Sequence, residues 1–519
     1  MSAHRGMGGG PALLAIGLAA ILAACGGGGG GGGDAVVPPP LATAGPAWWG
    51  FGRDAQHAAQ GGVATQDLAR IVWQAPVDLT PPYVANNVLL IHYGPPAITA
   101  RNTVIFGVKL NRDSGFRIEA RAGANGALQW SAPTDYVLPS HEWVPSYNVA
   151  LSRANRVYWP GAGGKLFYRD DADAANAAVQ SVVFYGNATY DAARSAYDAA
   201  VTISTPLTID PAGNVYFGFL VNGATPAGLA SGFARVAPDG TSTWIAASAA
   251  ANDARMVKPA GNSAPALAND LATVYVVATD APAPGEHASG ALLALDARTL
   301  APRAAVPLRD PATGEPAWVS DNGTASPTVG PDGDVFYGVL ESNAPAHNFR
   351  GWLLHFDATL RTAKVPGSFG WDQTVSIAPA SMVPQYAGPS SYLVVSKYNN
   401  YLGVGTGDGL NRMALLDPST SQADGISSLP VMREVATVLA PSGSMREWCV
   451  NTVAVDPATS SVLVNSEDGR LYRWHLPSNT LSQSVRFNNG YAEAYTPTSI
   501  GPDGKVYAIN NATLFAVGQ

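Results

Sequence analysis

Three twelve-residue segments decide the fold: TPLTIDPAGNVY at 205–216, SPTVGPDGDVFY at 326–337 and TPTSIGPDGKVY at 496–507. Each joins a short apolar stretch to a Val-Tyr or Val-Phe-Tyr stretch through a turn rich in Pro, Asp and Gly. Turns of this chemistry connect neighbouring antiparallel strands. A weaker copy is APALANDLATVY at 264–275. The four segments predict a β-hairpin that recurs along the chain.

The hairpins recur at an almost constant spacing. The intervals from Val157 to Val215, Val274 and Val335 are 58, 59 and 61 residues. From about residue 68 onward, short alternating apolar runs are separated by Gly, Pro, Asp and Asn, and only 174–178 and 190–200 suggest short helices. Strands repeated at this period are typical of propeller blades. We therefore predict an all-β propeller that forms a single domain over residues 48–519.

The repeat predicts eight blades, with seven as the alternative. The last blade lacks one strand, and the strand expected at 69–75 can supply it, which closes the ring and removes an exposed sheet edge. The predicted blades span residues 96–132, 147–187, 202–247, 263–308, 324–366, 375–440, 449–487 and 496–518.

A second motif follows the hairpins. Gly126 and Trp130 have the same spacing as Gly240 and Trp244, and Leu-Ala-Leu-Asp, Leu-His-Phe-Asp and Leu-Leu-Asp sequences end at Asp296, Asp357 and Asp417. These residues resemble the tryptophan-docking repeat of the pyrroloquinoline-quinone-like β-propeller superfamily, as do the segments 48–57 and 71–73. The resemblance covers about residues 48–519, with a degenerate motif in most blades. It implies that each Trp covers the face of the next blade.

The resemblance also raises the question of a cofactor. Quinoprotein dehydrogenases of this superfamily hold the quinone in the central channel between a Trp floor and a disulfide of adjacent cysteines, with Glu, Asn and Asp on a calcium ion. This chain has only Cys25 and Cys449, and no motif matches the calcium or catalytic positions. We therefore assign no catalytic residue and expect no cofactor or metal. Pyrroloquinoline quinone with calcium is the alternative.

Other metal chemistry has little support in the sequence. The eight histidines show no spacing typical of a metal site. The acidic run 170–173 lacks the glycine and distal Glu of a calcium loop, and we interpret it as a solvated turn.

The first 47 residues predict a targeting signal followed by a flexible tether. His4 and Arg5 precede the apolar stretch 11–24, which is too short to span a bilayer of roughly 30 Å and predicts a signal peptide over 1–24. The sequence ending at Cys25 resembles the bacterial lipobox, which implies acylation of Cys25, including palmitate. An ordinary signal peptide is the alternative. Residues 25–47 then form a Gly- and Pro-rich tether. Gly26, in place of Asp, implies outer-membrane sorting in a Gram-negative host.

The second cysteine has no partner if Cys25 carries lipid. We expect Cys449 to be buried beside Trp448 and Val450 in a strand, without a disulfide.

One stretch concentrates polar and aromatic residues suited to ligand binding at a channel mouth. The alternative is that Arg446 and Glu447 form a local ion pair and that Asn399 and Asn400 form a hairpin turn; residues 467–470 are also interpreted as a turn. The candidate ligand-binding residues are Lys397, Tyr398, Asn399, Asn400, Asp408, Arg446, Glu447 and Trp448.

Composition limits the remaining function classes. With 47% hydrophobic residues, the chain can build a hydrophobic core. Its net charge of -8 means that it does not present the broad positive potential that nucleic-acid binding requires. We expect first a non-catalytic, lipid-anchored envelope propeller that binds a protein or glycan partner. By architecture it is similar to the eight-bladed lipoprotein of the outer-membrane β-barrel assembly machinery. The alternative is a divergent pyrroloquinoline-quinone-dependent oxidoreductase. No motif specifies the partner or the oligomeric state.

Overall fold

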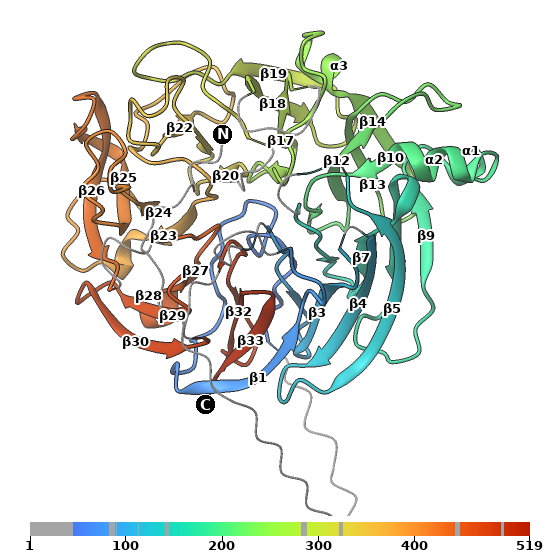
Figure 1. Ribbon diagram of the computed structural model, residues 1–519, viewed down its shortest axis with the longest axis horizontal. Helices are drawn as coiled ribbons and strands as arrows, with labels where there is room; N and C mark the ends of the chain where they lie inside the picture. The colour runs from blue at the N-terminus through green and yellow to red at the C-terminus, as the bar shows by residue number, and fades with distance from the viewer. Residues whose placement is uncertain are drawn as a thin grey trace, which may run out of the picture. The chain divides into compact units, whose positions relative to one another are not determined.

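Eight β-sheets surround a common axis in the computed structural model of the protein (Figure 1). The structure describes residues 45–519 except 83–88, 90, 113, 140, 142–144, 282–287, 321–324, 442–446 and 489–492. The described residues belong to one compact unit, Thr43–Gln519. The predictions of an all-β propeller and of eight blades are confirmed.

Each blade is an antiparallel sheet whose first strand lies nearest the axis. Blades 1 to 4 consist of β2 (Ala97–Ile98), β3 (Thr103–Lys109), β4 (Ser114–Ala122) and β5 (Leu128–Val137); β6 (Ala150–Leu151), β7 (Val157–Pro160), β8 (Lys165–Arg169) and β9 (Gln180–Val183); β10 (Val201–Ile203), β11 (Thr208–Ile209), β12 (Val215–Val221), β13 (Gly232–Val236) and β14 (Ser242–Ala246); and β15 (Lys258–Pro259), β16 (Ala266–Leu267), β17 (Thr273–Thr279), β18 (Gly290–Asp296) and β19 (Pro302–Pro307). Blades 5 to 8 consist of β20 (Thr328–Val329), β21 (Val335–Val339) and β22 (Trp352–Phe356); β23 (Ser376–Pro379), β24 (Tyr392–Tyr398), β25 (Arg412–Ala423) and β26 (Pro430–Leu439); β27 (Ala454–Asp456), β28 (Ser461–Ser466), β29 (Arg470–His475) and β30 (Thr480–Arg486); and β31 (Ser499–Ile500), β32 (Val506–Asn510), β33 (Thr513–Gly518) and β1 (Arg70–Pro76).

The ring is closed by the strand nearest the N-terminus. Strand β1 pairs antiparallel with β33, from Arg70 opposite Gly518 to Pro76 opposite Thr513. The closing strand expected at 69–75 is therefore confirmed, displaced by one residue. Trp73 from this strand is buried and reaches the next blade, where its indole N–H donates to the carbonyl of Gly123 at 3.0 Å.

Tryptophan docking takes place at some of the expected positions. Trp130 of blade 1 donates to the carbonyl of Ala172 in blade 2 at 2.8 Å, so it spans two blades as the motif implied. Trp244 instead packs edge-on against Phe219 of its own blade. Its side chain is partly buried, and the short helix α3 (Ala247–Ala251) begins directly after its strand.

A substitution at Gly126 tests whether the ring of Trp73 docks against this glycine. It has a φ of +73°, and a Cβ there would lie 2.7 Å from Cδ2 of Trp73. Gly228 has a similar φ of +65° but no atom within 4 Å of its Cβ position. We expect Gly126→Ala to lower the free energy of unfolding by roughly 1–3 kcal/mol more than Gly228→Ala, because overpacking adds to the backbone strain that both share. Urea unfolding of the two variants measures the difference, and equal losses would contradict docking on Gly126.

Two predicted helices have different outcomes. The segment 190–200 is helical, as α1 (Asn187–Asp191) and α2 (Arg194–Ala200). The segment 174–178 is not helical, so that expectation was wrong. The N–H of Ala174 donates to the carbonyl of Asp171 in a turn, and its own carbonyl accepts from Arg169, so these backbone groups are bonded outside a helix. The acidic run 170–173 lies in this turn, as predicted.

Blade 5 lacks a regular fourth strand and is completed by its neighbour. Residues 363 and 367 make only isolated bridges to β22. The long hairpin of β25 and β26 extends from blade 6, and Met432 N–H donates to the carbonyl of Pro366 at 2.8 Å. The apolar residues at its tip join the core of blade 5.

The residues before β1 fill one end of the channel. We call residues 48–66 the central segment and the end that it occupies, where the first and second strands of each blade join, the plugged mouth. Backbone carbonyls of the central segment accept from the innermost strands of six blades: Trp48 from Ile98, Trp49 from Leu151, Ala55 from Leu267, Gln56 from Val329, Ala58 from Ile377 and Ala59 from Val455. Blade 3 is reached through the ring of His57, 3.3 Å from the hydroxyl of Thr208, and blade 8 through the N–H of Gln66, which donates to Gly504. The chain thus winds once around the axis and bonds to every blade (Figure 1).

Candidate functional site

The opposite mouth of the channel carries most of the candidate residues. In an antiparallel blade, the turn between the second and third strands emerges at the same end as the connection to the next blade. The loop 399–411 after β24, the turn 467–469 after β28 and the connections at 447–453 and 493–498 therefore meet at this mouth, between blades 6, 7 and 8.

A group of carboxylates and one thiol lies there, which we call the carboxylate–thiol cluster: Glu447, Cys449, Glu467 and Glu493. Ligand atoms of Glu447, Cys449 and Glu467 all lie within 4.8 Å of one another. The Sγ of Cys449 lies 3.6 Å from Oε2 of Glu493, and the N–H of Glu447 donates to Oε1 of Glu467 at 2.6 Å. Three of the four side chains are buried, and Glu447 is half-buried.

Residues predicted from the sequence hold this cluster in place. Asn399 donates to Oε2 of Glu447 at 3.1 Å and to the carbonyl of Trp448 at 3.3 Å, and its own Oδ1 accepts from the N–H of Trp448. The Nζ of Lys397 lies 5.5 Å from the ring centroid of Tyr495. Lys397, Asn399, Glu447 and Trp448 are thus neighbours in space.

Protonation follows from burial. Burial, and next the negative charges of Glu467 and Glu447, raise the pKa of Glu493 well above its usual range. Burial also raises the pKa of the Cys449 thiol, and Glu493 adds to the effect. The thiol of Cys449 therefore stays protonated at neutral pH, and burial opposes ionisation of Glu493. The cluster offers no reactive thiolate.

The state of Cys449 is directly measurable. Cys449 is the only cysteine of the chain besides Cys25, and it is fully buried. We expect iodoacetamide at pH 8 to react with the folded protein at least about tenfold more slowly than with protein in guanidinium, since each unit of pKa increase removes about 90% of the thiolate. Mass spectrometry of quenched samples follows the rate, with Cys449→Ser as the blank. Equal rates in both states would show an accessible thiol.

The other predicted residues face blade 5. Side chains alternate along β24, so Tyr398 points away from Lys397 and stacks under Arg350, whose guanidinium carbon lies 3.9 Å from the ring centroid. Asn400 donates to Asp408 at 2.6 Å, inside the loop 399–411, so Asn399 and Asn400 do not form a hairpin turn. The seven candidate residues that the structure describes thus form two groups. Arg446, and with it the ion pair to Glu447, lies outside the described residues.

Two further expectations were tested at this mouth. Residues 448–450 do not form a strand: the N–H of Val450 bonds to the carbonyl of Trp448, and β27 begins only at Ala454. The turn at 467–470 is present, with Gly469 at a φ of +77°. Glu467 within it is nevertheless buried in the cluster, a role that the turn pattern did not indicate.

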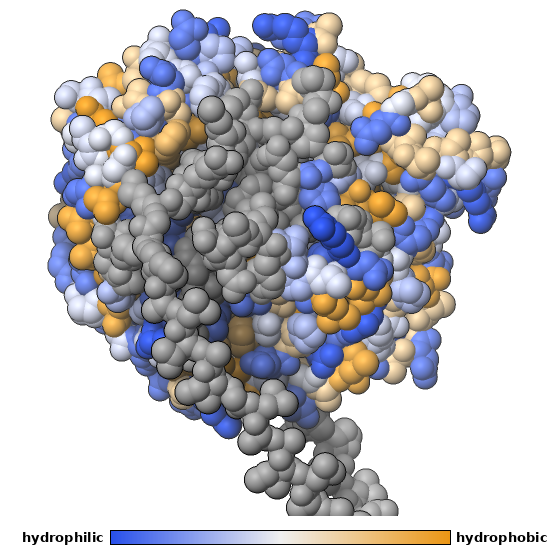
Figure 2. Space-filling view, in the orientation of Figure 1, coloured by the Kyte–Doolittle hydropathy of each residue, from blue (hydrophilic) through white to orange (hydrophobic). Residues whose placement is uncertain are grey.

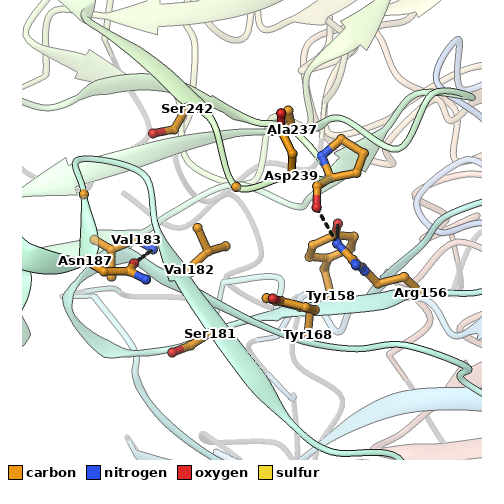
Figure 3. Close-up of a pocket in the computed structure, with 13 residues that line it drawn as sticks. Arg156, Tyr158, Tyr168, Ser181, Val182, Val183, Asn187, Ala237, Asp239 and Ser242 are labelled. Atoms are coloured by element: carbon orange, nitrogen blue, oxygen red, sulfur yellow. Dashed lines mark hydrogen bonds between the residues drawn. The ribbon is translucent and has the colours of Figure 1, made fainter.

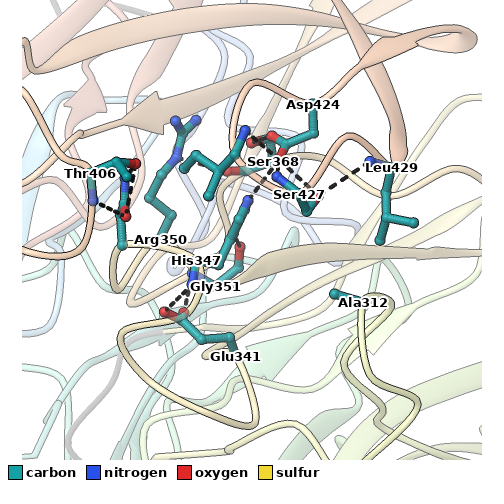
Figure 4. Close-up of polar contacts among 12 residues, drawn as sticks. Ala312, Glu341, His347, Arg350, Gly351, Ser368, Thr406, Asp424, Ser427 and Leu429 are labelled. Carbon is teal, nitrogen blue, oxygen red and sulfur yellow. Dashed lines mark hydrogen bonds and ion pairs between the residues drawn. The ribbon is translucent and has the colours of Figure 1, made fainter.

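A second polar network joins blade 5 to the hairpin of blade 6 (Figure 4). Asp424 at the hairpin tip accepts from Nε2 of His347 at 3.2 Å, from the hydroxyl of Ser368 and from Ser427. Burial opposes ionisation, but hydrogen bonds from His347 and Ser368 hold the pKa of Asp424 well below its usual range. A serine nucleophile needs a His between it and the acid. Here both ring nitrogens of His347 are occupied, by Asp424 and by the carbonyl of Gly351, and the network is structural.

A cavity of about 380 Å³ lies on the outer rim, and we call it the rim cavity (Figure 3). Blade 2 contributes Arg156, Tyr158, Tyr168 and residues 181–183 of β9, and blade 3 contributes the turn 237–242. Arg156 is held by Asp170 at 2.5 Å and by the carbonyl of Pro238 at 2.7 Å. The volume of the rim cavity falls within the range of small-ligand sites, roughly 300–1,000 Å³.

Comparison with known proteins supports the fold. No known protein-family model matches the chain, and no curated protein matches its sequence. A europium-containing methanol dehydrogenase has a TM-score of 0.54 at 10% identity, covering 89% of this chain and 88% of that chain. A quinohemoprotein alcohol dehydrogenase from Comamonas testosteroni has a TM-score of 0.53 at 13% identity, covering 92% and 82%. BamB from Moraxella catarrhalis, at a TM-score of 0.37, overlaps too weakly to bear on function. The chain has the propeller fold of the quinoprotein dehydrogenases, as its motifs implied.

The residues at the opposite mouth lack part of the quinone site that the resemblance implies. Ligands for a metal ion are present, since Glu447, Cys449 and Glu467 form a group that could hold one. Adjacent cysteines are absent from the sequence. We therefore derive no step through this cofactor.

Proposed function

We propose that the protein is a non-catalytic propeller of the bacterial envelope, anchored by lipid on Cys25, which binds a protein or glycan partner at its rim. The observation that carries this proposal is the rim cavity, which combines aromatic, cationic and acidic side chains from two blades. The chain's own central segment occupies one channel mouth, and the other is filled by a buried thiol and buried carboxyl groups, so the rim is the better place for recognition. None of the helices in the described part of the chain is long and apolar enough to span a bilayer.

Site-specific photo-crosslinking in cells tests recognition at the rim. A photoreactive residue at position 242, beside the rim cavity, is expected to give a discrete adduct. The same residue at position 482, on the exposed face of β30 in blade 7, serves as the matched control. Equal labelling at both positions, or none at either, would contradict the proposal.

A cofactor assay addresses the non-catalytic part. Full-length protein in detergent is mixed with pyrroloquinoline quinone and calcium, and an artificial electron acceptor dye is followed with a primary alcohol present. We expect no saturable cofactor absorbance and no dye reduction. Turnover would replace the binding role with the alternative, a divergent oxidoreductase.

The anchor is tested separately. Cys25→Ala is expected to abolish incorporation of labelled palmitate and to release the protein from the membrane fraction or leave it as precursor. Continued labelling of the variant would disprove lipidation at this residue.

A further inference from the structure

The outer strands of the blades differ in how they are protected. Charged residues and proline are among the features that keep an exposed strand edge from pairing with other chains. In the described residues, five of the seven outer strands contain such residues, whereas β9 (QSVV) and β14 (STWIA) contain neither. The protected strands are β1 with Arg70 and Pro76, β5 with Pro133 and Asp135, β19 with Pro302 and Arg303, β26 with Pro430 and Arg433, and β30 with Arg486.

The two unprotected strands belong to neighbouring blades and flank the rim cavity. Residues 181–183 of β9 line one side, and Ser242 of β14, with the turn before it, lines the other (Figure 3). The coloured part of the face in Figure 2 shows hydrophobic residues scattered among hydrophilic ones, without a large apolar patch that would suggest another docking surface there.

Backbone geometry identifies the free edge of β9. The N–H of Val183 donates to Oδ1 of Asn187 at 2.8 Å, and its carbonyl accepts from Gly186, so both groups point away from β8. Backbone groups along a strand alternate in direction. Ser181, two residues earlier and opposite Phe167, therefore directs its N–H and C=O to the outside. Ser181 is exposed, and 43% of Val179 just before it is exposed.

Charge favours a basic partner. Arg156 is neutralised by Asp170, whereas Asp239 in the cavity wall bonds to the N–H and hydroxyl of Thr241 and forms no ion pair within the described part of the chain. These bonds, and to a smaller extent the charge of Arg235, lower the pKa of Asp239, so it is ionised. A second copy of this chain is a less suitable partner, because its own net charge of -8 would repel the ionised Asp239.

We propose that an extended, basic peptide segment of a partner protein adds as a strand to the outer edge of β9. It pairs with the backbone of Ser181, places an apolar side chain in the rim cavity against Val182 and sets a Lys or Arg beside Asp239. This is strand addition, in which main-chain bonds supply affinity and the pocket supplies selectivity. The inference rests on the proposed function and names the partner class for that same site.

The test uses a labelled peptide, acetyl-Thr-Lys-Val-Tyr-Val-Lys-Thr-amide, and full-length protein in detergent, with fluorescence anisotropy as the readout. We expect saturable binding that falls at least about tenfold when alternate peptide nitrogens are methylated, because N-methylation removes strand hydrogen bonds and keeps the side chains. Ser181→Pro is expected to weaken binding similarly, and Ser181→Ala, which retains the backbone N–H, to leave it within about twofold. Asp239→Asn is expected to weaken binding and to reduce its salt dependence.

Several results would overturn the inference: no binding, equal binding of the N-methylated peptide, or binding unchanged by Ser181→Pro. If Ser181→Pro does not fold, as judged by its melting curve, the N-methylated peptide still decides. Concentration-dependent dimers that disappear in Ser181→Pro would assign the edge to a second copy instead. An adduct at position 242 without peptide binding would leave the proposed function standing and remove only this inference, whereas quinone turnover would remove the proposed function.

Discussion

Removal of residues 1–76 is expected to open the ring and produce protein that aggregates at ordinary temperature. The deletion takes away β1, its six paired positions with β33 and the buried ring of Trp73. Loss of a buried Trp costs roughly 3–5 kcal/mol, a large share of the roughly 5–15 kcal/mol of net stability typical of domains. The exposed edge of β33 then becomes available for pairing between molecules.

Melting temperature and light scattering measure this effect. Deletion of residues 26–44 is the matched control, because it shortens only the predicted tether and keeps every bond described for the ring. A truncation at 76 that melts together with the control would show that β1 contributes nothing to closure.

Removal of residues 46–61 alone, with β1 kept, is expected to destabilise the protein nearly as much. The deletion breaks eight backbone hydrogen bonds between the central segment and the innermost strands, and it removes the buried side chains of Trp48 and Phe51. At roughly 1 kcal/mol for each bond, this loss is comparable with the whole net stability.

Hydrogen exchange distinguishes the two deletions. Without the central segment, the amides of Val329 and Ile377 lose their acceptors and should exchange rapidly, whereas amides that pair β1 with β33 should stay protected if the ring remains closed. Unchanged protection at Val329 and Ile377, together with an unchanged melting temperature, would contradict a structural role for the segment.

The blades could be predicted because their signals are local. Each hairpin has turn residues within five positions of its strands, and the period of about 60 residues places the next one. The path of residues 48–66 could not be predicted, since its bonds reach partners up to several hundred residues away and follow no periodic pattern. The only sequence signal for this segment was the resemblance of residues 48–57 to the opening segment of related propellers.

Only part of the candidate site could be predicted, because the rest of it also depends on contacts between distant parts of the sequence. Neighbouring residues of β24 were grouped because they are adjacent in sequence, yet strand alternation sends Lys397 and Tyr398 to different blades. Glu467 was taken for a turn residue, and Glu493 was not selected, because a carboxylate recruited from another connection leaves no local signature. The strand expected at 448–450 failed because apolar composition alone does not separate a strand from an extended buried connection.

The central segment also sets the order in which the protein can mature. Residues 48–76 are made first, but their partners extend to Gly518 at the other terminus. At roughly 5–20 residues per second, synthesis of the rest of the chain takes on the order of half a minute. During that time Trp48 and Trp73 have no complete binding surface, and the nascent chain carries unpaired strands. Maturation of this propeller therefore has to wait for its last residue, and a chaperone that shields the N-terminal strand would act in that interval.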